Sequence, residues 1–258
     1  MVCRVSGVVI LFFLLSFPQS AVGKVITIAS DVWCPYICNS QAQPGVLLGV
    51  INLAAKEHKL TINFLPMPLA RSLKLIKTNK IDVVLALTAQ HIQEYNLRQS
   101  QQVFGGGYND FYVEKSTNWQ FKNVNQLMQF LNQGNTLGVI KGYEYGPAIE
   151  HLMSQSSKSL YIAVGVNPLA TNLKLLSKKR VTILLDSRFN VEYEIQNQKI
   201  SGLKHVGTEG RFVPLFLGFN RNMEQQYIDM FDQTLLRLRK SGQLAKILQT
   251  YGTPDWYF

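Results

Sequence analysis

Short apolar segments alternate with amphipathic ones along most of this chain of 258 residues. Residues 24–30, 81–88 and 181–186 are apolar runs of the kind that form buried strands. Residues 45–60 and 68–80 instead carry apolar residues at helical spacing. Strands that alternate with helices predict an α/β fold with largely parallel sheets.

The segment that begins at Pro68 is repeated a hundred residues later. PLARSLKLIKTNKIDVVLA from Pro68 matches PLATNLKLLSKKRVTILLD from Pro168 at several apolar positions and at one lysine. Both copies read as a helix that leads into a buried strand. Chance similarity between two amphipathic helices is the alternative, but the order of elements around both copies also agrees. The repeat predicts two α/β lobes of similar construction.

The first 23 residues have the parts of a secretory signal. Arg4 precedes an apolar run from Val8 to Phe17, and small residues follow at Ala21 and Gly23. The run is shorter than the roughly 20 apolar residues that a membrane-spanning helix needs. We therefore expect cleavage near Gly23 and a periplasmic mature protein; removing 23 residues from 258 leaves 235.

The formal net charge of +10 raises the question of a nucleic-acid partner. The basic residues are dispersed, however, and the densest run is only Ser177–Arg180. An exported protein rarely meets nucleic acid. We expect no nucleic-acid binding, and a basic surface that favours an acidic partner or membrane face.

Cys34 and Cys38 are the two cysteines that remain after removal of the signal. Disulfides persist in exported proteins, and two cysteines four apart in a turn can approach closely enough to form one. Their spacing is not the C-x-x-C of thiol oxidoreductases. A zinc site would need two further ligands at matched spacing, and the four histidines are isolated. We predict a disulfide, no metal and no cofactor.

Four segments resemble the family 3 solute-binding proteins, which are bilobed periplasmic receptors of ABC importers. Trp33, Pro35, Tyr36 and Gly45 follow the first predicted strand in the family's order. The other segments are LKLIKTNKIDVVLALT (73–88), TLGVIKGYEYG (136–146) and LLRLRKSGQLAKILQTYG (235–252). Each motif is weak alone, but together they cover nearly the whole mature chain in the family's order and spacing.

This resemblance implies a clamshell of the type II periplasmic-binding fold. Residues 24–108 and 214–258 would form lobe 1, and residues 109–213 would form lobe 2. A small polar solute, amino-acid-like or related, would bind in the cleft between them. The resemblance also implies a monomer that works with a membrane permease of an ABC importer.

The resemblance implies a carboxylate clamp that this sequence lacks. Relatives that bind amino acids place an arginine in T-x-x-R after the third strand, whereas here Thr88 is followed by His91. We expect His91 to be a surface loop residue rather than a ligand contact, which puts an ordinary α-amino acid in doubt. Arg71, in the first turn of the next helix back, is a candidate substitute; the alternative is an exposed helix arginine.

Other positions are ligand candidates by the same resemblance. Asp186 ends a strand where relatives often place the aspartate that holds an ammonium group; the alternative is a helix cap. Trp33 and Tyr36 could stack on a flat or cationic solute, or belong to the core. Gly142 and Tyr143 could offer backbone N–H groups to an anion. Arg71 and Asp186 are expected to face one cleft from opposite lobes.

A non-catalytic binding protein is therefore the leading hypothesis. An exported enzyme on the same fold, like the cyclohexadienyl dehydratases, is the second, although no paired carboxylates or nucleophile–base pair can be read from the sequence. A module that presents a ligand to a sensor kinase is the third.

Export can be checked directly. N-terminal sequencing of protein released by osmotic shock should begin near Lys24, because the signal peptidase removes what precedes it. A chain that begins at Met1 and stays in the membrane fraction contradicts this prediction.

Overall fold

The structure, a computed structural model, describes residues 24–256, so the predicted signal peptide lies outside the described part. In the first half of the chain, strands and helices alternate as the sequence predicts. The elements there are β1 (Val25–Ser30), α1 (Val46–Glu57), β2 (Thr61–Pro66), α2 (Leu69–Lys77), β3 (Val83–Leu87), α3 (Ala89–Glu94) and the short β4 (Arg98–Gln99).

The second half repeats this order, as the sequence repeat predicts. Its elements are α4 (Val124–Asn132), β6 (Leu137–Ile140), α5 (Pro147–Gln155), the 3-10 turn η1 (Ser157–Ser159), β7 (Leu160–Ala163), α6 (Pro168–Ser177), β8 (Ile183–Ser187) and α7 (Arg188–Asn197). The strand order β2-β1-β3 in one half matches β7-β6-β8 in the other, and the strands of each trio are parallel. The two halves therefore share one construction.

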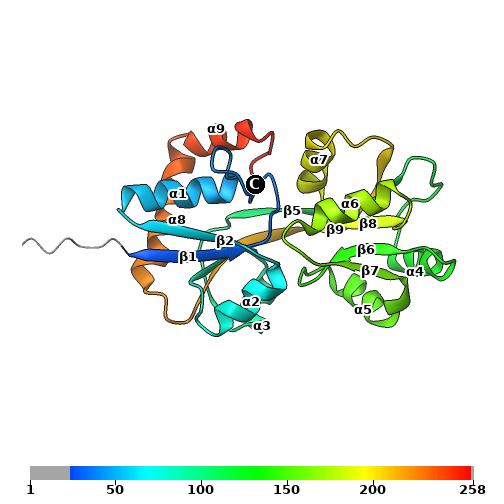
Figure 1. The fold of residues 1–258 in the computed structure, drawn as a ribbon, viewed down its shortest axis with the longest axis horizontal. Coiled ribbons are helices and arrows are strands. Elements are labelled where there is room, and N and C mark those ends of the chain that lie inside the picture. The colour runs from blue at the N-terminus through cyan, green and yellow to red at the C-terminus, as the bar shows by residue number, and fades with distance from the viewer. Residues whose placement is uncertain (1–23, 257–258) are drawn as a thin grey trace, which may run out of the picture.

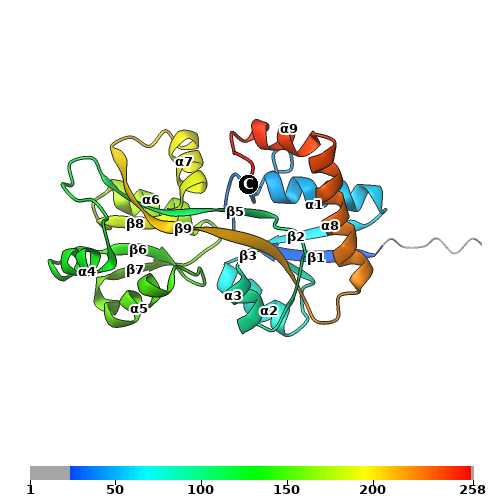
Figure 2. The same cartoon turned by 180° about the vertical axis from the view of Figure 1, so that it is seen from behind.

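Two long strands join the halves. β5 (Gly105–Glu114) and β9 (Leu203–Phe219) pair with each other in antiparallel fashion and cross the middle of the molecule (Figure 2). β9 also pairs with β3, and β5 with β8, so the complete sheet is mixed rather than only parallel. The expected lobe boundaries, at residues 108/109 and 213/214, fall within these two strands, and we keep them as our proposed division.

Each half buries apolar side chains on both faces of its sheet, as a layered α/β unit requires. In the first half, α1, α8 (Gln225–Lys240) and α9 (Gln243–Thr250) cover one face, and α2 and α3 cover the other (Figure 1). In the second half, α4 and α5 pack on one face and α6 and α7 on the other. Within residues 24–256, no helix has the length and apolar character to span a bilayer.

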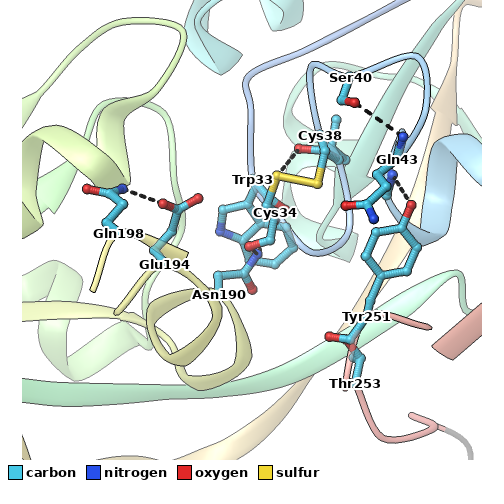
Figure 3. Close-up of a disulfide and its surroundings, with 12 residues drawn as sticks. Trp33, Cys34, Cys38, Ser40, Gln43, Asn190, Glu194, Gln198, Tyr251 and Thr253 are labelled. Atoms are coloured by element: carbon cyan, nitrogen blue, oxygen red, sulfur yellow. Dashed lines mark hydrogen bonds between the residues drawn. A yellow bond between two sulfur atoms is a disulfide. The ribbon is translucent and has the colours of Figure 1, made fainter. Parts of the chain in front are cut away.

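The loop between β1 and α1 is fastened by the predicted disulfide (Figure 3). Cys34 and Cys38 are joined, with 5.0 Å between their Cα atoms. Inside this short loop, the backbone of Trp33 bridges that of Ile37. Gly45 ends the loop with a φ of 93°, and a Cβ there would lie 2.6 Å from the carbonyl oxygen of Tyr36. Only glycine suits both this backbone conformation and this approach.

This close approach yields a matched pair of substitutions. Gly45→Ala should lower the free energy of unfolding by about 2–3 kcal/mol, because it adds a clash to an unfavourable φ. Gly49→Ala should raise it by about 0.5–1 kcal/mol, because Gly49 lies inside α1 with open space around the new Cβ. Urea unfolding measures both values, and equal effects at the two positions would contradict the role given to Gly45.

Candidate binding site

A cavity of about 60 Å³ lies where the two halves meet. At roughly 10–15 Å³ per water position, it has room for about four to six waters. Both halves line it. The lining residues are Ser30, Asp31, Trp33, Ile37, Leu69, Leu85, Ala86, Thr88, His91, Gly107, Asn109, Tyr143, Glu144, Asp186, Ser187, Val213 and Leu215.

The polar lining comes from the carboxyl ends of parallel strands. Asp31 follows β1, and Thr88 follows β3. In the other half, Glu144 lies in the loop after β6, and Asp186 lies near the end of β8. Ligand sites of open α/β sheets lie at this edge, and two like halves that face each other bring two such edges together.

Two buried aspartates face the cavity from opposite halves. Asp31 is 3% exposed and Asp186 is 1% exposed. Burial raises the pKa of Asp186 to about 7. Burial also raises the pKa of Asp31 to about 7, and the nearby charge of Asp186 adds to that rise. Both carboxyls therefore change charge near neutral pH when the cavity holds no cation.

Hydrogen bonds within and between the halves fix these carboxyls only in part. The Tyr143 hydroxyl donates to Oδ2 of Asp31 at 2.9 Å. Oδ1 of Asp186 accepts from the Ser187 backbone at 2.7 Å and from Nε1 of Trp33 at 3.4 Å. Oδ2 of Asp186 is buried without a hydrogen-bond partner. A buried carboxylate oxygen in this state is a strong site for a donor supplied by a ligand.

Glu144 adds a third carboxyl to the lining. Its side chain is 10% exposed, and burial raises its pKa to about 7. The Thr88 hydroxyl donates to Oε2, while Oε1 has no hydrogen-bond partner. Three acidic groups thus share a cavity whose lining includes no lysine or arginine among the residues from 24 to 256.

His91 is buried at the cavity, so the expectation of a surface loop residue is wrong. The Thr88 hydroxyl caps α3 by accepting from the His91 backbone, which starts the helix at this point and turns the ring inward. Nε2 of His91 donates to the Gly142 carbonyl at 2.8 Å, and Nδ1 accepts from the Thr88 backbone at 3.3 Å. Burial lowers the pKa of His91 to about 4, so the ring is neutral at pH 7.

The other predicted residues divide into two groups. Trp33, Thr88, Tyr143 and Asp186 line the cavity. Arg71 is exposed and does not line the cavity. Leu69 faces the cavity, and Arg71, two residues later in the same helix, lies about 200° further around the helix axis. We therefore leave Arg71 out of the proposed site, and with it the expected pair across the cleft.

Tyr36, Gly142 and Tyr143 have other contacts than those expected from the sequence. Tyr36 is fully buried in the core of the first half and donates to the Gly106 carbonyl at 3.2 Å, without lining the cavity. The Tyr143 backbone N–H donates to the Ile140 carbonyl and is not free for an anion, so Tyr143 contributes its side-chain hydroxyl to the cavity instead. Gly142 contributes the carbonyl that His91 binds.

Direct contacts hold the two halves closed around the cavity. The Val32 backbone N–H donates to the Val166 carbonyl at 2.7 Å. Nδ2 of Asn190 lies 2.9 Å from the carbonyl oxygens of both Trp33 and Cys34, beside the disulfide (Figure 3). Asn190 in α7 and His91 in α3 occupy the same position of equivalent helices, and each reaches the loop after the first strand of the opposite half.

The described part of the chain contains no group of three or more histidine, cysteine, aspartate or glutamate side chains placed to hold a metal ion.

The sequence model of one protein family, the bacterial extracellular solute-binding proteins, family 3, matches residues 26–254. The chain belongs to this family. A search of curated protein sequences found no match.

Solved structures show the same fold at low sequence identity. An ancestral arginine-binding protein bound to arginine superposes with a TM-score of 0.72 at 16% identity, over 88% of this chain and 97% of that one. A structure from work on glutathione import and the cystine ABC importer of Streptococcus mutans gives 0.72 at 14%, over 90% and 98%. A histidine kinase sensor domain similar to periplasmic binding proteins gives 0.68 at 15%, over 88% and 95%.

In this chain, burial of the cavity carboxyls disfavours their charged form, so their ionisation opposes folding of the empty protein. The pKa of Asp186 is about 7 in the folded protein against a usual 3.8, so stability from this group is complete below pH 4 and is lost as the pH rises through 7. Asp186→Asn removes this loss. Its free energy of unfolding should exceed that of the native protein by about 1–3 kcal/mol at pH 8, and by much less at pH 4.

Urea unfolding of ligand-free protein at the two pH values measures this difference. Glu57→Gln, an exposed change at the end of α1 and outside the cavity lining, is the matched control and should leave the pH dependence unaltered. If Asp186→Asn follows the pH dependence of the native protein, the buried charge does not control stability here.

Proposed function

We propose that this family member is an exported, non-catalytic receptor for a small solute that carries a protonated amine. The observation that supports the proposal most is the buried, unpartnered Oδ2 of Asp186 in a cavity that Asp31 and Glu144 also line. An ammonium group carries three N–H donors and a positive charge. It would supply the missing hydrogen bonds and also offset the repulsion among the carboxyls.

Charge also argues against an α-amino acid held in the family's usual manner. The cavity lining includes no lysine or arginine in the part of the chain that the structure describes, and His91 is neutral. A carboxylate placed beside Asp31 and Asp186 would be repelled. The group recognised in the cavity is therefore an amine, and any anionic group of the solute must lie outside this cavity.

We place the receptor in the periplasm as a monomer that delivers its solute to the permease of an ABC importer. Family membership and the fold shared with arginine-binding and cystine-importer proteins support transport. The likeness to a histidine kinase sensor domain supports presentation to a membrane sensor as the alternative partner.

A specific observation favours one other function. Asp31, Glu144 and Asp186 each have a pKa of about 7, which is the range in which a carboxyl acts as a general acid or base. The sequence does not reveal this cluster, and it supports an enzyme on the same fold as the second candidate. Hydroxyl groups do lie beside the carboxyls, since Ser30 hydrogen-bonds to Asp31 and Thr88 to Glu144. We prefer the receptor because the chain belongs to a family of solute-binding proteins.

Calorimetric titration with primary amines tests the proposal. A small amine should bind at pH 8, and its affinity should fall by about tenfold for each carboxyl involved between pH 8 and pH 6, because the empty site takes up protons that the cation must displace. Asp186→Asn should weaken binding and reduce this pH dependence.

The same titration separates the two candidates. Amine recovered unchanged after long incubation with stoichiometric protein agrees with a receptor, and chemically altered amine establishes the enzyme. Absence of amine binding at pH 8 excludes the proposed function.

A further inference from the structure

A second chamber adjoins the central cavity. It has a volume of about 250 Å³, and β9, one of the two strands that join the halves, forms part of its lining. Its lining residues are Thr88, Ala89, Gln90, Glu144, Tyr145, Arg211, Phe212, Val213 and Pro214. Thr88, Glu144 and Val213 also line the central cavity, so these residues form a shared wall.

Glu144 makes two side-chain contacts at this wall, one with the Thr88 hydroxyl and one of 3.6 Å between its Oε1 and Nε2 of His91. The Thr88 hydroxyl from one half donates to Oε2 of Glu144 from the other half. Oε1 of Glu144 is buried at the same wall without a hydrogen-bond partner. The central cavity has room for only about four to six waters at about 60 Å³, so a larger solute must extend past this wall. A rotation of the Glu144 side chain would join the two spaces.

A β-bulge places a cation in the second chamber. Tyr108 of β5 pairs with Phe212, and Asp110 pairs with Thr208, so residues 209–211 of β9 stand opposite a single residue of β5. Gly210 permits this with a φ of 111°. Bulges redirect side chains beside functional sites. Here the bulge carries Arg211, whose exposed guanidinium has no hydrogen-bond or ion-pair partner within residues 24–256.

Arg211 is the one lysine or arginine that lines either space in the described residues. The lining is therefore acidic at the inner end and basic at the outer end. A guanidinium binds a carboxylate through two parallel hydrogen bonds, which makes it the side chain best suited to that group. A solute whose own charges run in the opposite order would match both ends.

We propose that Arg211 binds a carboxylate at the far end of the solute, so that the receptor selects amino acids whose amine and carboxylate are separated by a carbon chain. This inference rests on the proposed function, since the amine is taken to occupy the central cavity. An α-amino acid has both charges on one carbon and cannot place them on the two sides of the wall. A diamine would bring a second cation to Arg211 and be repelled.

The test compares ω-amino acids of three to six carbons with n-alkylamines of the same length by calorimetry at pH 8. At least one ω-amino acid should bind the native protein about tenfold or more tightly than its matched amine. Arg211→Gln should lower the affinity for that ω-amino acid to that for its matched amine, while Arg211→Lys should keep part of the advantage. Arg221→Gln, an exposed arginine outside both spaces, is the control and should change neither affinity.

The outcomes separate the two proposals. If amines bind but no ω-amino acid binds better, or if the advantage survives in Arg211→Gln, the role of Arg211 is wrong and the amine receptor stands. If neither series binds the native protein, both proposals fail. Weaker binding of both series by Asp186→Asn, with the advantage of the ω-amino acid retained, supports the two-ended site.

Discussion

The cost of placing three carboxyl groups around one small cavity governs the rest of this structure. Asp31 and Asp186 are almost fully buried, and Glu144 lines the same cavity with one oxygen that has no hydrogen-bond partner. Burial of such groups favours their neutral form, so the empty cavity holds protons that a bound cation would displace. Affinity, pH dependence and the stability of the empty protein are thus consequences of the same charges.

Closure of the two halves relies on their shared construction. His91 and Asn190 are each the third residue of equivalent helices, and each side chain binds backbone carbonyl oxygen in the opposite half. Carbonyl acceptors do not depend on the identity of side chains, and both donors are uncharged. The halves can therefore meet without adding charge to a site that already carries three acidic groups, and the carboxyls remain available for the solute.

The periodic features of the fold could be read from the sequence, whereas several residues of the site could not. Apolar spacing predicts the strands, the helices and the repeat, because each of these depends on neighbours in the chain. Asp186 can be predicted because it is an acid that ends an apolar strand. Asp31 follows β1 in the same way, so the same pattern marks it as a candidate.

Orientation explains the remaining differences. His91 turns inward because Thr88 caps α3, which places His91 in the first turn of a helix instead of in a loop. Arg71 turns outward because it lies on the opposite side of α2 from Leu69. Glu144 lines the cavity beside Thr88, which comes from the opposite half. Cap geometry, helical rotation and contacts between distant segments are not expressed in local spacing.

The disulfide gives the loop after β1 a role in the timing of activity. It closes a short loop over residues 34–38, and the carbonyls of Trp33 and Cys34 at the start of that loop are the acceptors of Asn190. A rigid acceptor loses less conformational entropy when the halves close. Disulfides form in oxidising compartments, so with the predicted export this rigidity is acquired only after the chain has left the cytoplasm. The newly made precursor would then close less readily on solute already inside the cell, and tight capture would begin where capture is useful.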